Sequence, residues 1–136
     1  MRYLAKRVER ICDELYRLRI VQRIPLTDLI CKKGTYIRPE AADAATPPWT
    51  SFDSRTMHWY GPDEHYWFRT EFTVPKALNG KAMWLNVRTQ IEGDDGKNPQ
   101  FLLFVNNVPV QGMDMNHRDV LLSPKAISGE KLVFDL

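Results

Sequence analysis

The sequence predicts a mainly β protein, an antiparallel β-sandwich that follows an N-terminal α-helix and a long Pro-containing connector. Residues 101–105 form a continuous apolar run bounded by turn residues, which is typical of a strand buried inside a sandwich. In residues 66–73, apolar and polar side chains alternate with a period of two, as on a half-buried strand. Several such short segments follow one another without crossover helices, which favours antiparallel sheets.

Residues 1–24 predict an amphipathic helix. Its apolar residues recur at spacings of four and three, which places them on one stripe, and charged residues fill most of the opposite face. The stripe consists of Leu4, Val8, Ile11, Leu15 and Leu18. We expect this helix to pack on the rest of the protein or on a partner subunit; a membrane-surface or nucleic-acid-binding helix is the alternative. Pro25 ends it, because proline cannot donate to the preceding turn.

Residues 25–50 predict a connector along the outside of the sandwich. They hold several prolines and a small-residue stretch at 41–46, and no hydrophobic period persists across them. One further helical turn is expected around Leu26–Cys31. Residues 51–136 then form the sandwich. Because an apolar strand runs into the last residue, Leu136, we expect this domain to be truncated at its C-terminal end.

A tight hairpin is predicted after the buried strand 101–105. Asn106-Asn107 suits a two-residue turn, because Asn tolerates positive φ better than any residue except Gly. The chain then returns as a second strand from Val108 to Gln111. Pro109 lacks an N–H group, so this strand is expected at a sheet edge or at a bulge.

The remaining strands are expected at 81–89, at Val120–Leu122 and at 131–136. A turn-rich loop at 90–99 separates the first of these from the hairpin. Its Gly-Asp-Asp-Gly sequence at 93–96 could hold a cation through clustered oxygens, but an exposed turn is the preferred interpretation.

The composition argues against several classes of protein. Lys and Arg number 19 against 17 Asp and Glu, a net charge of only +2, whereas nucleic-acid binders carry a strong basic excess. The sequence contains no apolar run long enough to span a membrane, and its N-terminus is too charged for a signal peptide. Cys12 and Cys31 lack a metal or redox spacing and indicate reduced thiols, which predicts a cytoplasmic protein; a disulfide between them is the alternative.

Two stretches of the sandwich region carry a family resemblance. The order Trp67-Phe68-Arg69-Thr70, then Val74-Pro75, Gly80-Lys81 and a hairpin after Val105 resembles the galactose-binding-like jelly roll of large glycoside hydrolases. Asn107 stands where those proteins usually have Gly. More narrowly, GPDEHYWFRTEFTVP and PQFLLFVNNVPVQGMDMNHRDVLL are similar to the N-terminal region of family 38 α-mannosidases of the cytosolic and bacterial type.

The resemblance implies a full-length enzyme that hydrolyses α-mannosidic bonds with an active-site Zn²⁺. Its metal ligands and nucleophilic Asp would belong to a downstream catalytic domain, so no catalytic residue is assigned here, and this chain alone is expected to be inactive. His117-x-Asp119 formally fits a His-x-Asp metal motif, but it lies in the hairpin region and is rejected as the metal site. The implied partners are the catalytic domain of the same polypeptide, a mannose-containing oligosaccharide and further copies in a homo-oligomer, with no nucleic acid and no membrane.

Candidate contacts with substrate or with a neighbouring domain are aromatic and polar residues in and near the two similar stretches. They are Trp59, His65, Tyr66, Trp67, Asp114, Asn116, His117 and Arg118. The expected function is a non-catalytic accessory domain that supports the catalytic domain and subunit contacts. The alternative is a stand-alone carbohydrate-binding module with Trp59, Tyr66 or Trp67 as its stacking platform. For the polar residues, local hydrogen bonding within the loops is equally compatible with the sequence.

Overall fold

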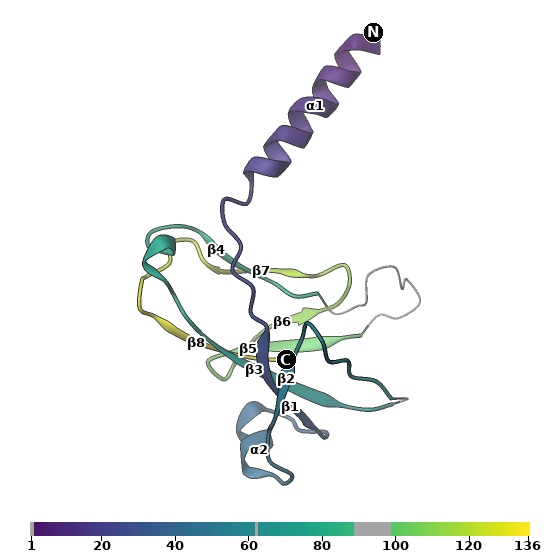
Figure 1. Cartoon of the computed structure of the whole chain (residues 1–136), viewed down its shortest axis with the longest axis vertical. Helices are drawn as coiled ribbons and strands as arrows, with labels where there is room; N and C mark the ends of the chain where they lie inside the picture. Colours follow the sequence, from purple (N-terminus) through teal and green to yellow (C-terminus); the bar gives the residue numbers. More distant parts are fainter. Residues whose placement is uncertain (1, 62, 89–98) are drawn as a thin grey trace.

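The computed structural model describes residues 2–61, 63–88 and 99–136 (Figure 1). It is mainly β, with antiparallel sheets and an N-terminal helix, α1 (Arg2–Leu18), which confirms the coarse prediction. The loop expected at 90–99, with its possible cation site at 93–96, lies outside the described residues apart from its last position.

Two antiparallel sheets make up the body. The larger has the strand order β2 (Thr50–Asp53), β1 (Asp28–Lys33), β3 (Tyr66–Thr73), β8 (Lys131–Asp135), β5 (Phe101–Val105) and β6 (Val108–Met113). The smaller pairs β4 (Met83–Asn86) with β7 (Asp119–Ser123). A short helix, α2 (Pro39–Ala44), and a single 3₁₀ turn, η1 (Lys76–Leu78), complete the described elements.

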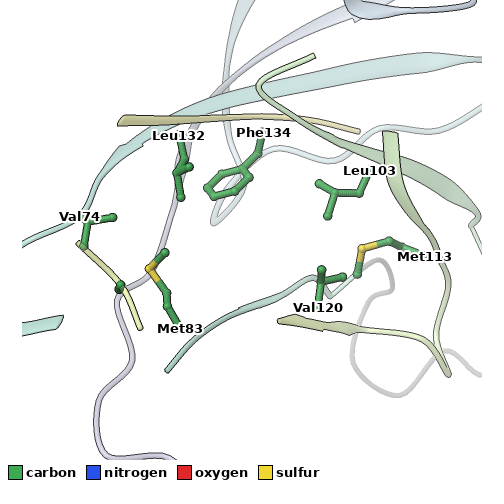
Figure 2. Close-up of a cluster of buried hydrophobic side chains, with 8 residues drawn as sticks. Val74, Met83, Leu103, Met113, Val120, Leu132 and Phe134 are labelled. Atoms are coloured by element: carbon green, nitrogen blue, oxygen red, sulfur yellow. The ribbon is translucent and has the colours of Figure 1, made fainter. Parts of the chain in front are cut away.

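The core lies between the two sheets (Figure 2). Its labelled side chains are Val74, Met83, Leu103, Met113, Val120, Leu132 and Phe134, and all of them are buried. Burying one such side chain stabilises the fold by about 1.5–3 kcal/mol. Because strand side chains alternate, every second residue of β8 and β3 points away from this core, to the outer face of the large sheet.

The hairpin forms where the sequence predicts it. Asn106 and Asn107 have φ values of 49° and 66°, which are the left-handed values that a tight turn of this hand requires. The Asn106 side-chain oxygen accepts a hydrogen bond from the Val133 N–H at 2.8 Å, which ties the turn to β8. Strand β6 is an edge strand, and its register with β5 shifts beside Pro109, as expected for a residue without an N–H.

The connector prediction for residues 25–50 needs correction. The expected helical turn at Leu26–Cys31 is wrong, because Asp28–Lys33 is strand β1, which pairs with β2 on one side and β3 on the other. Three consecutive apolar residues, Leu29 to Cys31, suit either conformation, and the pairing with β3 decides for the strand. The segment is therefore part of the large sheet, with α2 beside it.

Helix α1 ends at Leu18, earlier than the expected boundary at residue 24. It projects away from both sheets, and its apolar stripe is exposed rather than packed on the rest of the protein (Figure 1). Packing of this stripe on the described part of the chain's own body is therefore not observed. Within the described ranges, no helix is long and apolar enough to cross a bilayer.

Candidate functional site

A cluster of charged side chains occupies the outer face of the large sheet. Arg69 of β3 lies directly opposite Asp135 of β8 in the strand register, and its Nε donates to Asp135 Oδ1 at 2.6 Å. A second guanidinium nitrogen donates to Asp43 Oδ1 of α2, also at 2.6 Å. Asp43 further accepts a hydrogen bond from the Trp49 indole at 3.0 Å. Arg69 thus joins two strands of the sheet to α2.

Burial sets the charge state of this cluster. Asp135 has 0% of its surface exposed, and burial raises the pKa of its carboxyl although Arg69 opposes the shift. Burial also works against the charge on Arg69, but the hydrogen bonds to Asp43 and Asp135 outweigh it and raise the Arg69 pKa. Within the described part of the chain, the second oxygen of Asp135 has no hydrogen-bond partner. The ion pair therefore carries a desolvation cost, and the strand register and the hydrogen bond keep its two groups together.

Lys32 fixes α2 to the same face. Only 2% of this residue is exposed, and its ammonium donates to the backbone carbonyls of Ala42 and, at 2.5 Å, of Ala45. The Tyr36 and Trp49 rings lie 5.3 Å and 5.9 Å from the ammonium, within the range of a cation–π contact. A buried lysine that caps the end of α2 explains why so short a helix is ordered.

An open pocket of about 330 Å³ lies beside the charged cluster. Its lining combines carboxylates, amides and a guanidinium: Asp43, Arg69, Glu71, Asn106, Asn107 and Val133. Such groups can donate to and accept from neighbouring hydroxyls of a polyol. This site could not be recognised from the sequence alone. The alternation in β3 placed Arg69 and Glu71 on one face, but nothing local showed that β8 and the Asn106-Asn107 turn lie beside them.

The predicted polar loop after β6 forms a second, exposed arrangement. The Asp114 carboxylate accepts hydrogen bonds from the backbone N–H groups of Asn116 at 2.7 Å and of His117 at 2.8 Å, and it contacts the His117 ring Nδ1 at 3.0 Å. These bonds, led by the one from the His117 ring, lower the pKa of Asp114. Arg118 donates through its Nε to the Met115 carbonyl. One carboxylate thus organises the loop.

His117 is held in orientation but not covered. Its side chain is 71% exposed, while Nδ1 faces Asp114. A carboxylate on one ring nitrogen fixes the direction in which the rest of the ring points. The loop can therefore present a preoriented imidazole to a partner.

The aromatic candidates divide between the two faces of the large sheet. Trp59 packs on Tyr66 at 5.9 Å and on Phe101 at 5.5 Å between ring centroids, on the core side. Trp67 points to the outer face, is 8% exposed and lies 5.7 Å from Phe104. Because it is buried, Trp67 is not available as a stacking platform for a sugar.

The remaining candidates are placed as follows. His65 is exposed, and its backbone carbonyl accepts from the Gly34 N–H at 2.9 Å. Phe101, which contacts Trp59, pairs in register with Met113, the residue before Asp114. The structure therefore places Trp59 and Tyr66 together on the core side of the large sheet and Trp67 on its outer face.

A metal site does not assemble from the described residues, where no three His, Cys, Asp or Glu side chains come close enough to hold an ion. His117 faces Asp114, whereas Asp119 accepts a hydrogen bond from the Asn86 amide at 2.8 Å, so the two ends of the formal His-x-Asp motif serve separate contacts. The zinc implied by the family resemblance would belong to the downstream catalytic domain, and the described residues of this chain do not form a ligand set for it.

Comparison of the chain with protein-family models, with curated proteins and with solved structures finds no match. The function is therefore inferred from the residue pattern and the geometry above.

Proposed function

We propose that this chain is the non-catalytic N-terminal accessory domain of a family 38 α-mannosidase of the cytosolic and bacterial type. The two stretches that resemble that family, residues 61–75 and 99–122, supply β3, the β5–β6 hairpin and the polar loop. The proposal includes a galactose-binding-like jelly roll, which two facing antiparallel sheets support.

The observation that carries this proposal is the exposed His117 held by Asp114. The loop already satisfies its own backbone groups through the Asp114 carboxylate, so docking would cost little further conformational entropy. Fixed polar groups that remain exposed on a loop are typical of contact surfaces. The loop would dock on the catalytic domain of the same polypeptide or on its active-site rim in a neighbouring subunit.

The proposed division of labour follows from this placement. The downstream domain would hold the Zn²⁺ and the nucleophilic Asp and would hydrolyse α-mannosidic bonds. This domain would cover it and contribute to subunit contacts in a cytoplasmic homo-oligomer.

Two experiments test the proposal. Sequencing the gene beyond the codon for Leu136 should reveal a long continuation with a His-x-Asp motif, and a stop codon there would count against the accessory domain. In the intact enzyme, His117→Ala should change the kinetics or the subunit assembly. His58→Ala is the matched control, because His58 is also exposed and lies outside the candidate contact residues. Unchanged behaviour of His117→Ala would remove the docking role.

A carbohydrate-binding module is the second candidate, and the pocket beside Arg69 favours it. Its carboxylates and amides suit the hydroxyls of a pyranose. Titration of the 136-residue chain with mannose or mannobiose should then give saturable heat, and Glu71→Ala should abolish it. Glu130→Ala, an exposed acidic residue outside the pocket lining, is the control. Absence of binding at millimolar sugar would exclude this function.

A further inference from the structure

We propose that α1 pairs in antiparallel orientation with α1 of a second copy of this chain. The inference goes beyond the proposed function, since it depends on this helix alone. Its failure would leave the accessory-domain proposal standing.

The starting observation is that the apolar seam of α1 is exposed. The five stripe residues are between 53% and 74% exposed, and extended chain separates α1 from the sheets (Figure 1). The members of the seam are Leu4, Val8, Ile11, Leu15 and Leu18. Exposed leucine, isoleucine and valine in one row are stabilised when a matching surface covers them.

The spacing of the seam indicates which kind of surface fits. Alternating steps of four and three place apolar residues at only two positions of each heptad, which is the narrow seam of a helix pair rather than the wider face of a helix packed on a sheet. A lipid surface fits less well. The helix carries Glu9, Asp13 and Glu14 among its basic residues, and it lacks the Trp and Phe that anchor interfacial helices.

Charge selects the orientation and the register. Arg7 and Glu14 flank the seam on the same side, at equivalent heptad positions. If Leu4 lies opposite Leu15 of the second copy, Arg7 of each helix faces Glu14 of the other, so the pair forms twice. Sliding one helix by a heptad would instead place Glu14 opposite Glu14.

Contacts within one helix do not account for this complementarity. Arg7 and Glu14 are seven residues apart, roughly 10 Å along the axis, which is too far for an intrahelical ion pair. Glu14 does lie 3.6 Å from Arg10, but both side chains are largely exposed there.

A parallel pair is disfavoured on three grounds. It would align the two helix dipoles unfavourably and leave Arg7 facing Cys12. It would also require Arg19 opposite Glu14, but the Arg19 guanidinium already lies over the Tyr16 ring at 4.3 Å. None of these objections applies to the antiparallel arrangement.

The length of the helix bounds the strength of the contact. Its 17 residues make little more than two heptads, so the dimer should be weak and depend on concentration. In an oligomer with other contacts, the same pairing would act as a reinforcing contact between copies.

Sedimentation equilibrium of the 136-residue chain, from about 10 µM to about 1 mM, is the test. The native chain should show a monomer–dimer equilibrium. Arg7→Glu alone and Glu14→Arg alone should each raise the dimer dissociation constant about tenfold, because both interhelical pairs become repulsive. An equimolar mixture of the two variants should recover the native affinity, since only unlike copies then pair favourably. Asp13→Arg, which makes the same charge change on the far side of the helix, should leave the affinity unchanged.

Any one of four results would overturn the proposal. The chain could stay monomeric throughout, the single variants could match the native chain, or the mixture could fail to recover. Binding of a monomeric chain to anionic phospholipid vesicles, lost in Leu15→Gln, would assign the seam to a lipid surface and would also overturn it.

Discussion

The carboxylates of Asp135 and Asp114 each bind a basic side chain, but the first pair is buried and the second is exposed. Asp135 is fully buried on the outer face of the large sheet and binds Arg69, whereas Asp114 lies in a surface loop and binds the largely exposed His117. Burial raises the pKa of the first, and hydrogen bonds lower the pKa of the second. Exposure therefore decides the role of such a pair: the buried pair holds elements of the fold together, whereas the exposed pair is available for contact with a partner.

The largest effect is expected from Arg69→Met. The change leaves Asp135 buried and unpaired and releases Asp43, so the free energy of unfolding should fall by about 3–5 kcal/mol in urea denaturation. Arg55→Met is the control, because Arg55 makes its ion pair with Asp53 in solvent and should matter little. A loss for Arg69→Met as small as that for the control would show that the buried pair does not hold the sheet and α2 together.

Two neighbouring lysines offer an intermediate test on the same strand. Lys32→Met removes the donor to the Ala42 and Ala45 carbonyls and should lower the free energy of unfolding by about 1–3 kcal/mol. Lys33→Met removes only an exposed contact with Glu64 and should be nearly neutral. Equal effects of the two substitutions would contradict the buried role of Lys32.

The contributions of Asp114 and Asp135 to the free energy of unfolding should change with pH in opposite directions. The folded-state pKa of Asp114 lies below 3.8, so its contribution to stability is present above that pH and is lost as the pH falls through the lower value. The pKa of Asp135 is raised, so its protonated form favours the folded state and this contribution is lost as the pH rises through the raised value. On acidification, the destabilisation by Asp114→Asn should therefore fade and that by Asp135→Asn should grow. Parallel trends in unfolding experiments would refute the contrast.

The smallest effect is expected from His117→Ala in the 136-residue chain. Because the ring is largely exposed, the melting temperature should change little. A marked drop in a thermal melt would mean that the loop serves the fold itself, which would weaken the docking role.

The sequence predicted the features that depend on neighbouring residues. The alternation in β3 and the Asn106-Asn107 turn are local patterns, and both were confirmed. Strand β1 was missed because its apolar residues are consecutive and because Lys32, which α2 buries on the outer face of the sheet, resembles a surface residue in the sequence. The Arg69–Asp135 pair joins residues far apart in the chain, so only the pairing of β3 with β8 could reveal it. The polar loop was predicted, but the hydrogen bonds by which Asp114 organises it are visible only in the structure.

The central proposal is that the Asp114–Arg118 loop docks on another domain, and amide hydrogen exchange tests it most directly. The exchange of residues 114–118 would be compared between the 136-residue chain and the intact enzyme. Docking predicts markedly slower exchange of these amides in the intact enzyme, with the buried amides of β5 unchanged. Equal exchange of the loop in both forms would contradict the proposal.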